Sequence, residues 1–237
     1  MQIINVEGLG RIEFPDSMSR EQIDAAIKNE IRPALERQIA SVQLAQLPGA
    51  ASVEANPFSK GTALADFGYR VGDTYTYKTI DLLTKLETDQ QTQRVTALTD
   101  SEVIFGNGRR ITDYLGNLIK NPRGQTFTGS QYFVSEYRMG KTWTTRFRGT
   151  RRSGDPDEWV LDFKVVAREN INVPAGTFDA FKVEGEGFNR NGNHYNITYW
   201  IAPDKVRQPI AMNTINRVGG RKYIANDRIE LLDFKQG

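Results

Sequence analysis

The chain has 237 residues, enough for one large β-domain with a small appendage or for two ordinary domains. Its 31 Lys and Arg nearly balance 29 Asp and Glu, and this leaves a formal charge of +2 without the concentrated basic surface that nucleic-acid binding requires. The chain contains no cysteine, which excludes disulfides, thiolate zinc sites and cysteine nucleophiles. We also expect no transmembrane segment and no signal peptide, because no apolar run approaches ~20 residues and residues 1–6 lack a basic start.

Residues 1–46 are predicted to form a β-hairpin followed by a long helix. Residues 3–6 and 11–14 have strand composition and flank a glycine-containing turn. Ser19 is a candidate N-cap, and Gln22 three residues later completes a capping box. Pro33 lies within the predicted helix and should kink or split it.

One face of this predicted helix is apolar, with residues at four-residue spacing. Its members are Ile23, Ile27, Ile31, Leu35 and Ile39. Such a stripe must be buried, either against the chain's own β-domain or against another protein. We take Ile23, Ile27, Ile31 and Leu35 as candidate partner-binding residues. The predicted partner is another protein or a second copy of this chain, bound through residues 1–68.

Residues 47–68 change in composition to Pro, Gly, Ala, Ser and Asn, without periodicity. This stretch is long for a connection inside a compact domain. It is predicted to be a linker or an extended arm between two units, which are residues 1–46 and 69–237.

Residues 69–237 are predicted to be almost entirely β. About ten short runs of strand composition recur at intervals of roughly 8–15 residues, separated by turn residues. The main runs are residues 74–79, 93–98, 102–105, 143–147, 159–166, 180–184, 195–200, 209–212 and 224–234. This spacing predicts a mainly β fold whose antiparallel sheet is strongly curved or forms a half-barrel. Alternating polar and apolar residues indicate one wet face and one dry face.

Two motifs in this region resemble bacterial envelope proteins of unassigned function. Residues 173–178 read Val-Pro-Ala-Gly-Thr-Phe, and residues 199–203 read Tyr-Trp-Ile-Ala-Pro. The resemblance extends over residues 69–235 and implies a half-barrel shell like that of periplasmic lipoprotein carriers, with an apolar concavity and a binding role. It implies no catalytic residue.

The front segment resembles a different class of protein. Residues 13–16 read Glu-Phe-Pro-Asp and resemble short segments of phage virion proteins. The two resemblances together favour a cell-envelope or virion-associated location over a free cytoplasmic one.

Catalytic motifs are sparse. His194 is the single histidine, it follows the Asn191-Gly192 turn, and the chain has no Gly-x-Ser-x-Gly elbow. Asp155, Asp157 and Glu158 lack the spacing of a calcium loop and are predicted to be a solvated acidic turn. No cofactor or metal is predicted. Paired carboxylates of a glycosidase stay open as an alternative, with candidates at Asp162, Glu169, Glu184 and Glu186.

The first functional prediction is a non-enzymatic structural or assembly component of a larger bacterial or phage complex, which docks through its N-terminal segment. The alternative is a carrier or binding module whose β-shell holds an apolar ligand such as a lipid or acyl chain. A glycan hydrolase is third. A filled shell interior favours assembly, whereas a cavity of several hundred Å³ favours a carrier.

Overall fold

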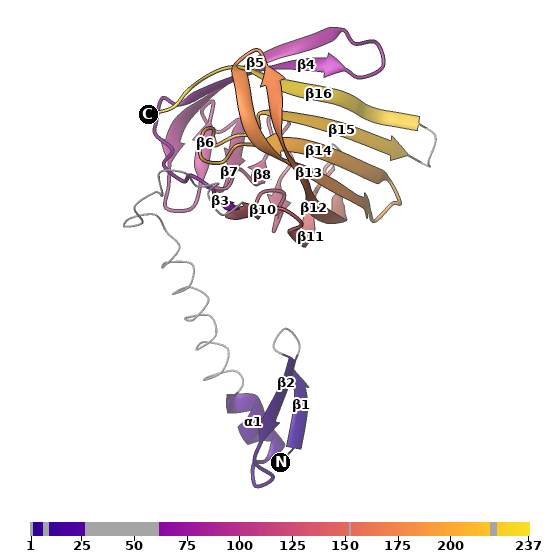
Figure 1. The fold of residues 1–237 in the computed structure, drawn as a ribbon. Helices are drawn as coiled ribbons and strands as arrows, with labels where there is room; N and C mark the ends of the chain where they lie inside the picture. Colours follow the sequence, from indigo (N-terminus) through magenta and orange to yellow (C-terminus); the bar gives the residue numbers. More distant parts are fainter. Residues whose placement is uncertain (1, 7–9, 27–61, 152, 219–221) are drawn as a thin grey trace. The chain divides into compact units, whose positions relative to one another are not determined.

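A computed structural model describes residues 2–6, 10–26, 62–151, 153–218 and 222–237 (Figure 1). The chain divides into two compact units, Met1–Ser52 and Val53–Gly237. We describe each unit by itself and call the second one the barrel domain.

The first unit contains a β-hairpin and the start of a helix. Strand β1 (Gln2–Val6) pairs antiparallel with β2 (Gly10–Phe14), and α1 (Arg20–Ala26) follows. The capping box forms as predicted. The Ser19 amide donates to Gln22 Oε1 at 2.9 Å, and the Gln22 amide donates to Ser19 Oγ at 3.3 Å.

The predicted long helix is described only as far as Ala26. Ile23 is buried, with 1% of its surface exposed. The other three candidate partner-binding residues, Ile27, Ile31 and Leu35, lie outside the described residues. The length of the helix and the role of its apolar stripe therefore stay predictions.

Strands, joined by turns and loops, are the regular secondary structure of the described residues of the barrel domain. The strands are β3 (Thr62–Leu64), β4 (Thr74–Asp81), β5 (Glu87–Leu98), β6 (Val103–Phe105), β7 (Arg110–Thr112), β8 (Leu118–Lys120), β9 (Phe127–Thr128), β10 (Glu136–Arg138), β11 (Thr142–Thr150), β12 (Pro156–Val173), β13 (Gly176–Asn189), β14 (His194–Ile201), β15 (Ala211–Val218) and β16 (Lys222–Lys235). The mainly β, antiparallel prediction is confirmed.

Twelve of these strands form one sheet in the order β8-β7-β6-β5-β4-β16-β15-β14-β13-β12-β11-β9. Strand β4, early in the domain, pairs with β16 at its end, for example Tyr75 with Phe234. The two outermost strands, β8 and β9, meet through a bridge between Lys120 and Thr126. The sheet is therefore nearly closed into a barrel, a more complete closure than the predicted half-barrel.

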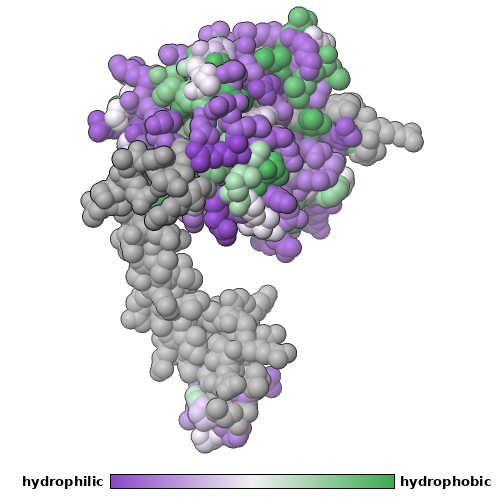
Figure 2. All heavy atoms as spheres, viewed as in Figure 1, coloured by the Kyte–Doolittle hydropathy of each residue, from purple (hydrophilic) through white to green (hydrophobic). Residues whose placement is uncertain are grey.

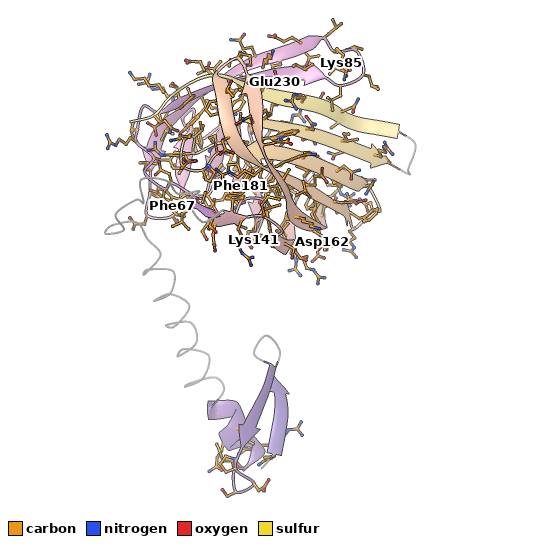
Figure 3. All side chains as sticks on the ribbon, viewed as in Figure 1. Phe67, Lys85, Lys141, Asp162, Phe181 and Glu230 are labelled. Atoms are coloured by element: carbon orange, nitrogen blue, oxygen red, sulfur yellow. The ribbon has the colours of Figure 1, made fainter. Side chains whose placement is uncertain are left out.

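Alternation along the long β12–β13 hairpin separates core from solvent. Leu161, Phe163 and Val165 are buried, whereas Asp162 between them is exposed. Figure 3 shows the same contrast, with Phe181 inside the barrel domain and Asp162 at its margin. The buried side chains form two clusters, one around Phe163 and Tyr199 and the other around Tyr75, Tyr77 and Leu231.

Strand β3 lies within residues 47–68, the stretch predicted to be a linker. It pairs with β10, so that Ala63 lies opposite Tyr137, and both residues are fully buried in the Phe163 cluster. The Ala65 amide then donates to the Ser135 carbonyl at 2.8 Å. Ala63 is therefore part of the barrel core, and such a small buried residue explains why composition alone did not reveal a strand.

Hydrophilic residues cover most of the barrel face visible in Figure 2, and hydrophobic residues form small separate groups. The exposed large apolar residues are Leu64, Val71, Leu83, Leu86, Met139, Phe188 and Val218. None of the described helices is long and apolar enough to cross a bilayer.

Candidate functional site

The barrel domain contains a partly open cavity of about 470 Å³. Inward-facing residues of β4, β5, β7, β8, β11, β12 and β14–β16 line it, and both core clusters contribute. Its aromatic wall residues are Tyr77, Phe127, Tyr132, Phe133, Phe147, Trp159 and Tyr195. Several of them are packed against one another, as when Phe147 stacks on Trp159 at a centroid distance of 5.1 Å.

Arg110 of β7 is the charged residue among those that line the cavity. Its Nη1 donates to Gln93 Oε1 at 2.6 Å, and both Nη1 and Nη2 donate to Gln208 Oε1 at 3.3 Å. The guanidinium also lies 4.9 Å from the centroid of the Phe105 ring. Arg110 is therefore positioned by two neutral amides and an aromatic face.

No carboxylate of the described residues forms an ion pair with Arg110. Burial lowers the pKa of its guanidinium, and the neighbouring Tyr69 and Tyr77 offset this only in part. An arginine pKa nevertheless lies far above 7, so the side chain stays positively charged at neutral pH. The cavity consequently contains a cation that has no charged partner among the described residues.

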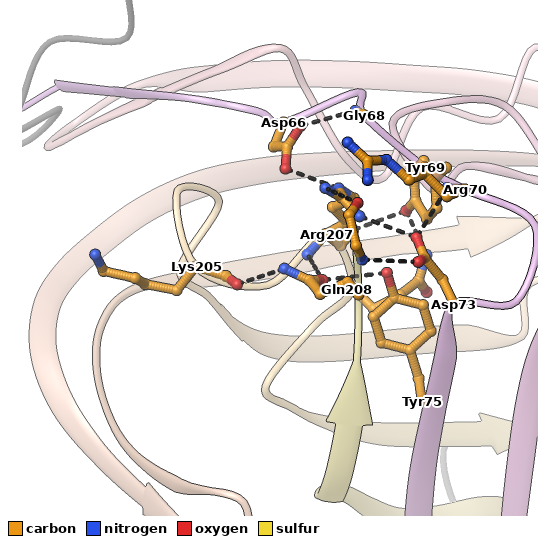
Figure 4. A network of polar contacts seen from close by, with 11 residues as sticks. Asp66, Gly68, Tyr69, Arg70, Asp73, Tyr75, Lys205, Arg207 and Gln208 are labelled. Atoms are coloured by element: carbon orange, nitrogen blue, oxygen red, sulfur yellow. Dashed lines mark hydrogen bonds and ion pairs between the residues drawn. The ribbon is translucent and has the colours of Figure 1, made fainter.

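A second arginine, Arg207, lies in the adjoining polar network (Figure 4). Its Nε donates to Asp66 Oδ2 at 2.7 Å, and its Nη1 donates to Asp73 Oδ2 at 2.9 Å. Burial alone would lower the pKa of Arg207, but these two carboxylates outweigh it and raise that pKa. The network reaches the cavity through Gln208, whose Nε2 donates to the Tyr69 hydroxyl at 2.7 Å.

The loop of residues 129–135, which we call the wall loop, closes part of the cavity. It contributes Tyr132 and Phe133 to the lining. Asn117 is buried and binds both backbone groups of one loop residue, because it accepts from the Phe133 amide at 2.7 Å and donates to the Phe133 carbonyl at 3.0 Å. The Tyr199 hydroxyl donates to the Tyr132 carbonyl at 2.7 Å. Sequence reasoning missed this loop.

The residues considered for catalysis lie elsewhere. His194 begins β14, where its Nε2 is 2.7 Å from Glu186 Oε1 and its ring stacks on Phe188. It is partly buried, although its position after the turn predicted an exposed residue. The carboxylates Asp162, Glu169, Glu184 and Glu186 are all exposed and are absent from the cavity lining.

The acidic turn differs from its prediction. Asp157 is buried and accepts from Arg151 Nε at 3.1 Å and from Asn189 Nδ2 at 2.8 Å, so it is a structural anchor and not a solvated residue. In the part of the chain that the structure describes, no three His, Asp or Glu side chains are grouped to hold a metal ion.

Arg110 was not recognised as a functional residue from the sequence. It follows Arg109 and precedes Ile111, and this pair of basic residues has the composition of an exposed turn. Arg109 is an exposed residue of the turn before β7, whereas Arg110 begins the strand and lines the cavity. That signal is visible only once the three-residue strand β7 is known.

A family model described as Protein of unknown function (DUF3108) matches residues 133–226, less than half of the chain. This agrees with the resemblance to proteins of unassigned function, and it does not bear on residues 13–16. The matched segment runs from β10 into β16 and includes the wall residues Phe147 and Trp159. Arg110 and Gln93 lie outside it. No curated protein matches the chain.

Three solved structures are similar to the chain at low identity. A candidate exported protein with a YmcC-like fold from Bacteroides fragilis is 14% identical, with a TM-score of 0.48, covering 73% of this chain and 100% of that one. A candidate lipoprotein from Parabacteroides distasonis is 12% identical, with a TM-score of 0.46, and the match covers 73% of this chain and 99% of that one. The hypothetical lipoprotein YmcC from Escherichia coli is 11% identical, with a TM-score of 0.42, and the match covers 92% of this chain and 98% of that one.

Proposed function

We propose that the barrel domain is a non-enzymatic binding module, or carrier, that holds a largely apolar small molecule in its cavity. The observation that carries the proposal is the cavity of about 470 Å³ with its aromatic walls. Ligand sites are typically roughly 300–1,000 Å³ and apolar, with a few polar groups that orient the ligand. A cavity of this size favours the carrier over a barrel that is only a filled scaffold.

The chemistry of the lining also supports binding over catalysis. The described residues of the lining include no Asp, Glu, His or Lys. Ser130 and Thr214 supply hydroxyl groups, but no general base accompanies them in the lining. The described residues of the lining also provide no pair of carboxylates for the hydrolysis of a glycosidic bond.

The proposal is tested by measuring binding of a neutral, environment-sensitive dye, N-phenyl-1-naphthylamine, to the full chain. We expect saturable fluorescence enhancement at about one dye per chain, and native mass spectrometry of the purified protein should show any co-purified ligand. Replacing Thr214 in the lining with tryptophan should fill the cavity and abolish the enhancement. Thr92→Trp on the exposed face of β5 is the matched control and should bind like the parent protein.

Two results would overturn the carrier proposal. One is the absence of saturable dye binding to the folded parent protein. The other is equal binding by Thr214→Trp and the parent protein, since the dye would then occupy a different surface.

We retain assembly as a second proposed role, for residues 1–52. The observation that favours it is that Met1–Ser52 forms a compact unit of its own, with a hairpin and a capped helix. Replacing Ile27 and Ile31 together with Asp should abolish association with a partner or a second copy while the barrel stays folded. Sedimentation velocity of both forms measures the self-association. A monomeric parent protein whose double variant only loses thermal stability would contradict this role.

A further inference from the structure

We propose that the ligand of the barrel cavity is a single-chain amphiphile with an anionic head group, and that Arg110 binds this head group. The inference rests on the proposed binding function and specifies the chemical class of the ligand. It follows from four observations on charge, donor geometry and volume.

The first observation is the missing counter-charge. A buried cation is costly unless a negative group accompanies it. Gln93 and Gln208 provide only neutral amide oxygens to Arg110, and no carboxylate is found among the described residues that line the cavity. An anionic ligand would supply the charge that this part of the protein lacks.

The second observation is the contrast with Arg207 in the same polar network. Arg207 is neutralised by Asp66 and Asp73 within the chain. The nearby Asp113 carboxylate is also engaged, since it accepts from the Leu115 amide and from Asn117 Nδ2, both at 2.9 Å. The carboxylates around the network therefore have other partners, and the partners of Arg110 among the described residues are neutral.

The third observation concerns the donors that remain on Arg110. A guanidinium has five N–H donors in a fixed plane. Bonds to Gln93 and Gln208 use Nη1 and one hydrogen of Nη2, and Nε makes no hydrogen bond to the described residues. Nε and the second Nη2 hydrogen share one edge of the plane, and this edge matches a carboxylate or phosphate with two parallel bonds.

This edge is also open. Some buried polar atoms of the described residues lack a hydrogen-bond partner because the fold seals them off, and Thr112 Oγ1 and Asn216 Oδ1 are examples. Arg110 Nε is not among these atoms although it has no partner. Since Arg110 lines the cavity, the surface that it keeps accessible is available to a ligand there.

The fourth observation is volume. A cavity of about 470 Å³ holds about 16 groups of the size of a water molecule, at about 30 Å³ each, and a methylene group is of similar size. A saturated carboxylic acid with about fourteen carbons has this number of heavy atoms, whereas a lipid with two long chains has far more. The aromatic walls can pack against such an alkyl chain, and Arg110 can bind its anionic head group.

The test compares ligands with one tail and different heads on the full-length protein. Tetradecanoate, tetradecyl phosphate, methyl tetradecanoate and tetradecyltrimethylammonium are each titrated, below their micelle concentrations, against bound N-phenyl-1-naphthylamine. We expect the two anions to displace the dye at concentrations about tenfold or more below those of the neutral ester. The cation should be weakest. The difference between carboxylate and phosphate identifies the preferred head.

Variants then assign the preference to Arg110. Arg110→Met should bind the ester like the parent protein and lose the preference for the anions, while Arg110→Lys should keep part of it through its charge. Arg109→Met removes the same charge from the exposed neighbouring position and should leave the preference intact. Circular dichroism checks that each variant is folded, and the head-group comparison in the parent protein stands even if Arg110→Met does not fold.

The outcomes separate this inference from the function on which it rests. Equal displacement by ester and anions in the parent protein would overturn the anionic ligand and leave the apolar binding module in place. A preference that persists in folded Arg110→Met would overturn the role of Arg110. Failure of the parent protein to bind the dye or any of the four ligands would overturn the binding function itself.

Discussion

Phe163 illustrates how one side chain restricts which residue can lie opposite it on the paired strand. Its ring stacks on Trp143 at a centroid distance of 5.3 Å and occupies the space next to Gly185 on the paired strand β13. A Cβ atom at Gly185 would lie 2.2 Å from Phe163 Cε1, closer than any real contact. Glycine is therefore required there so that an aromatic ring can lie against the backbone.

Gly185→Ala should destabilise the barrel domain by about 1–3 kcal/mol, because the added methyl overpacks a filled core. Urea unfolding of the parent and variant proteins measures the change. The double variant Gly185→Ala with Phe163→Leu should lose less free energy of unfolding than the sum of the losses in the two single variants. Strict additivity would show that the two residues do not compete for the same space.

At the scale of elements, the wall loop depends on one side chain that is not part of it. Asn117 precedes β8, yet both of its amide atoms bond to the backbone of Phe133. The loop contributes Tyr132 and Phe133 to the cavity lining, so the position of Asn117 influences the shape of the ligand site.

Asn117→Ala should lower the free energy of unfolding by about 1–3 kcal/mol, since it leaves the Phe133 amide and carbonyl without partners. Hydrogen exchange should increase in residues 129–135 more than in the β12–β13 hairpin. Dye affinity should fall as the cavity wall loosens. Equal exchange in the loop of the parent and variant proteins would contradict this anchoring role.

The sequence predicted elements where local pattern and structure agree. Alternation revealed β4, the Ser19–Gln22 capping box marked the start of α1, and the long β12–β13 hairpin had clear strand composition. The bounds of β7 and the two- or three-residue strands β8 to β10 were not predicted, because so few residues show no period. Arg110 and the cavity depend on these short strands, since an enclosed volume is set by how distant strands close on one another.

The boundary of the barrel domain is a property of the whole molecule. Ala63 of β3 is buried in the core opposite Tyr137, although β3 comes before β4, the first long strand of the domain. A fragment of residues 53–237 should therefore unfold cooperatively and at a higher temperature than a fragment of residues 65–237. Differential scanning calorimetry compares the two. Equal midpoints would show that β3 adds nothing to the stability of the barrel.

The barrel also encloses many tyrosines. Burial raises the pKa of Tyr69, Tyr77 and Tyr132 above the ordinary value of 10.0. A raised folded-state pKa means that the unfolded chain ionises first. The stability contributed by these groups is thus complete below about pH 10 and is lost as the pH rises further.

Alkaline titration should consequently show phenolate absorbance from these tyrosines appearing together with the loss of near-ultraviolet circular dichroism above about pH 10. Tyr77→Phe removes one such group and should shift the transition to higher pH, after correction for the lost bond from the Tyr77 hydroxyl to the Pro209 carbonyl. Ionisation of all tyrosines well before unfolding would contradict their burial.

The pairing of β4 with β16 determines when the barrel is able to form during synthesis. Tyr75 cannot pair with Phe234 until nearly the whole barrel domain has been translated. At about 5–20 residues per second, this delay is on the order of ten to thirty seconds. During that time β4 can already pair with β5, but its other edge, which later pairs with β16, is unpaired. One edge of the nascent sheet therefore stays unpaired until residues 222–235 have been synthesised, and such an edge is prone to non-native pairing with other chains.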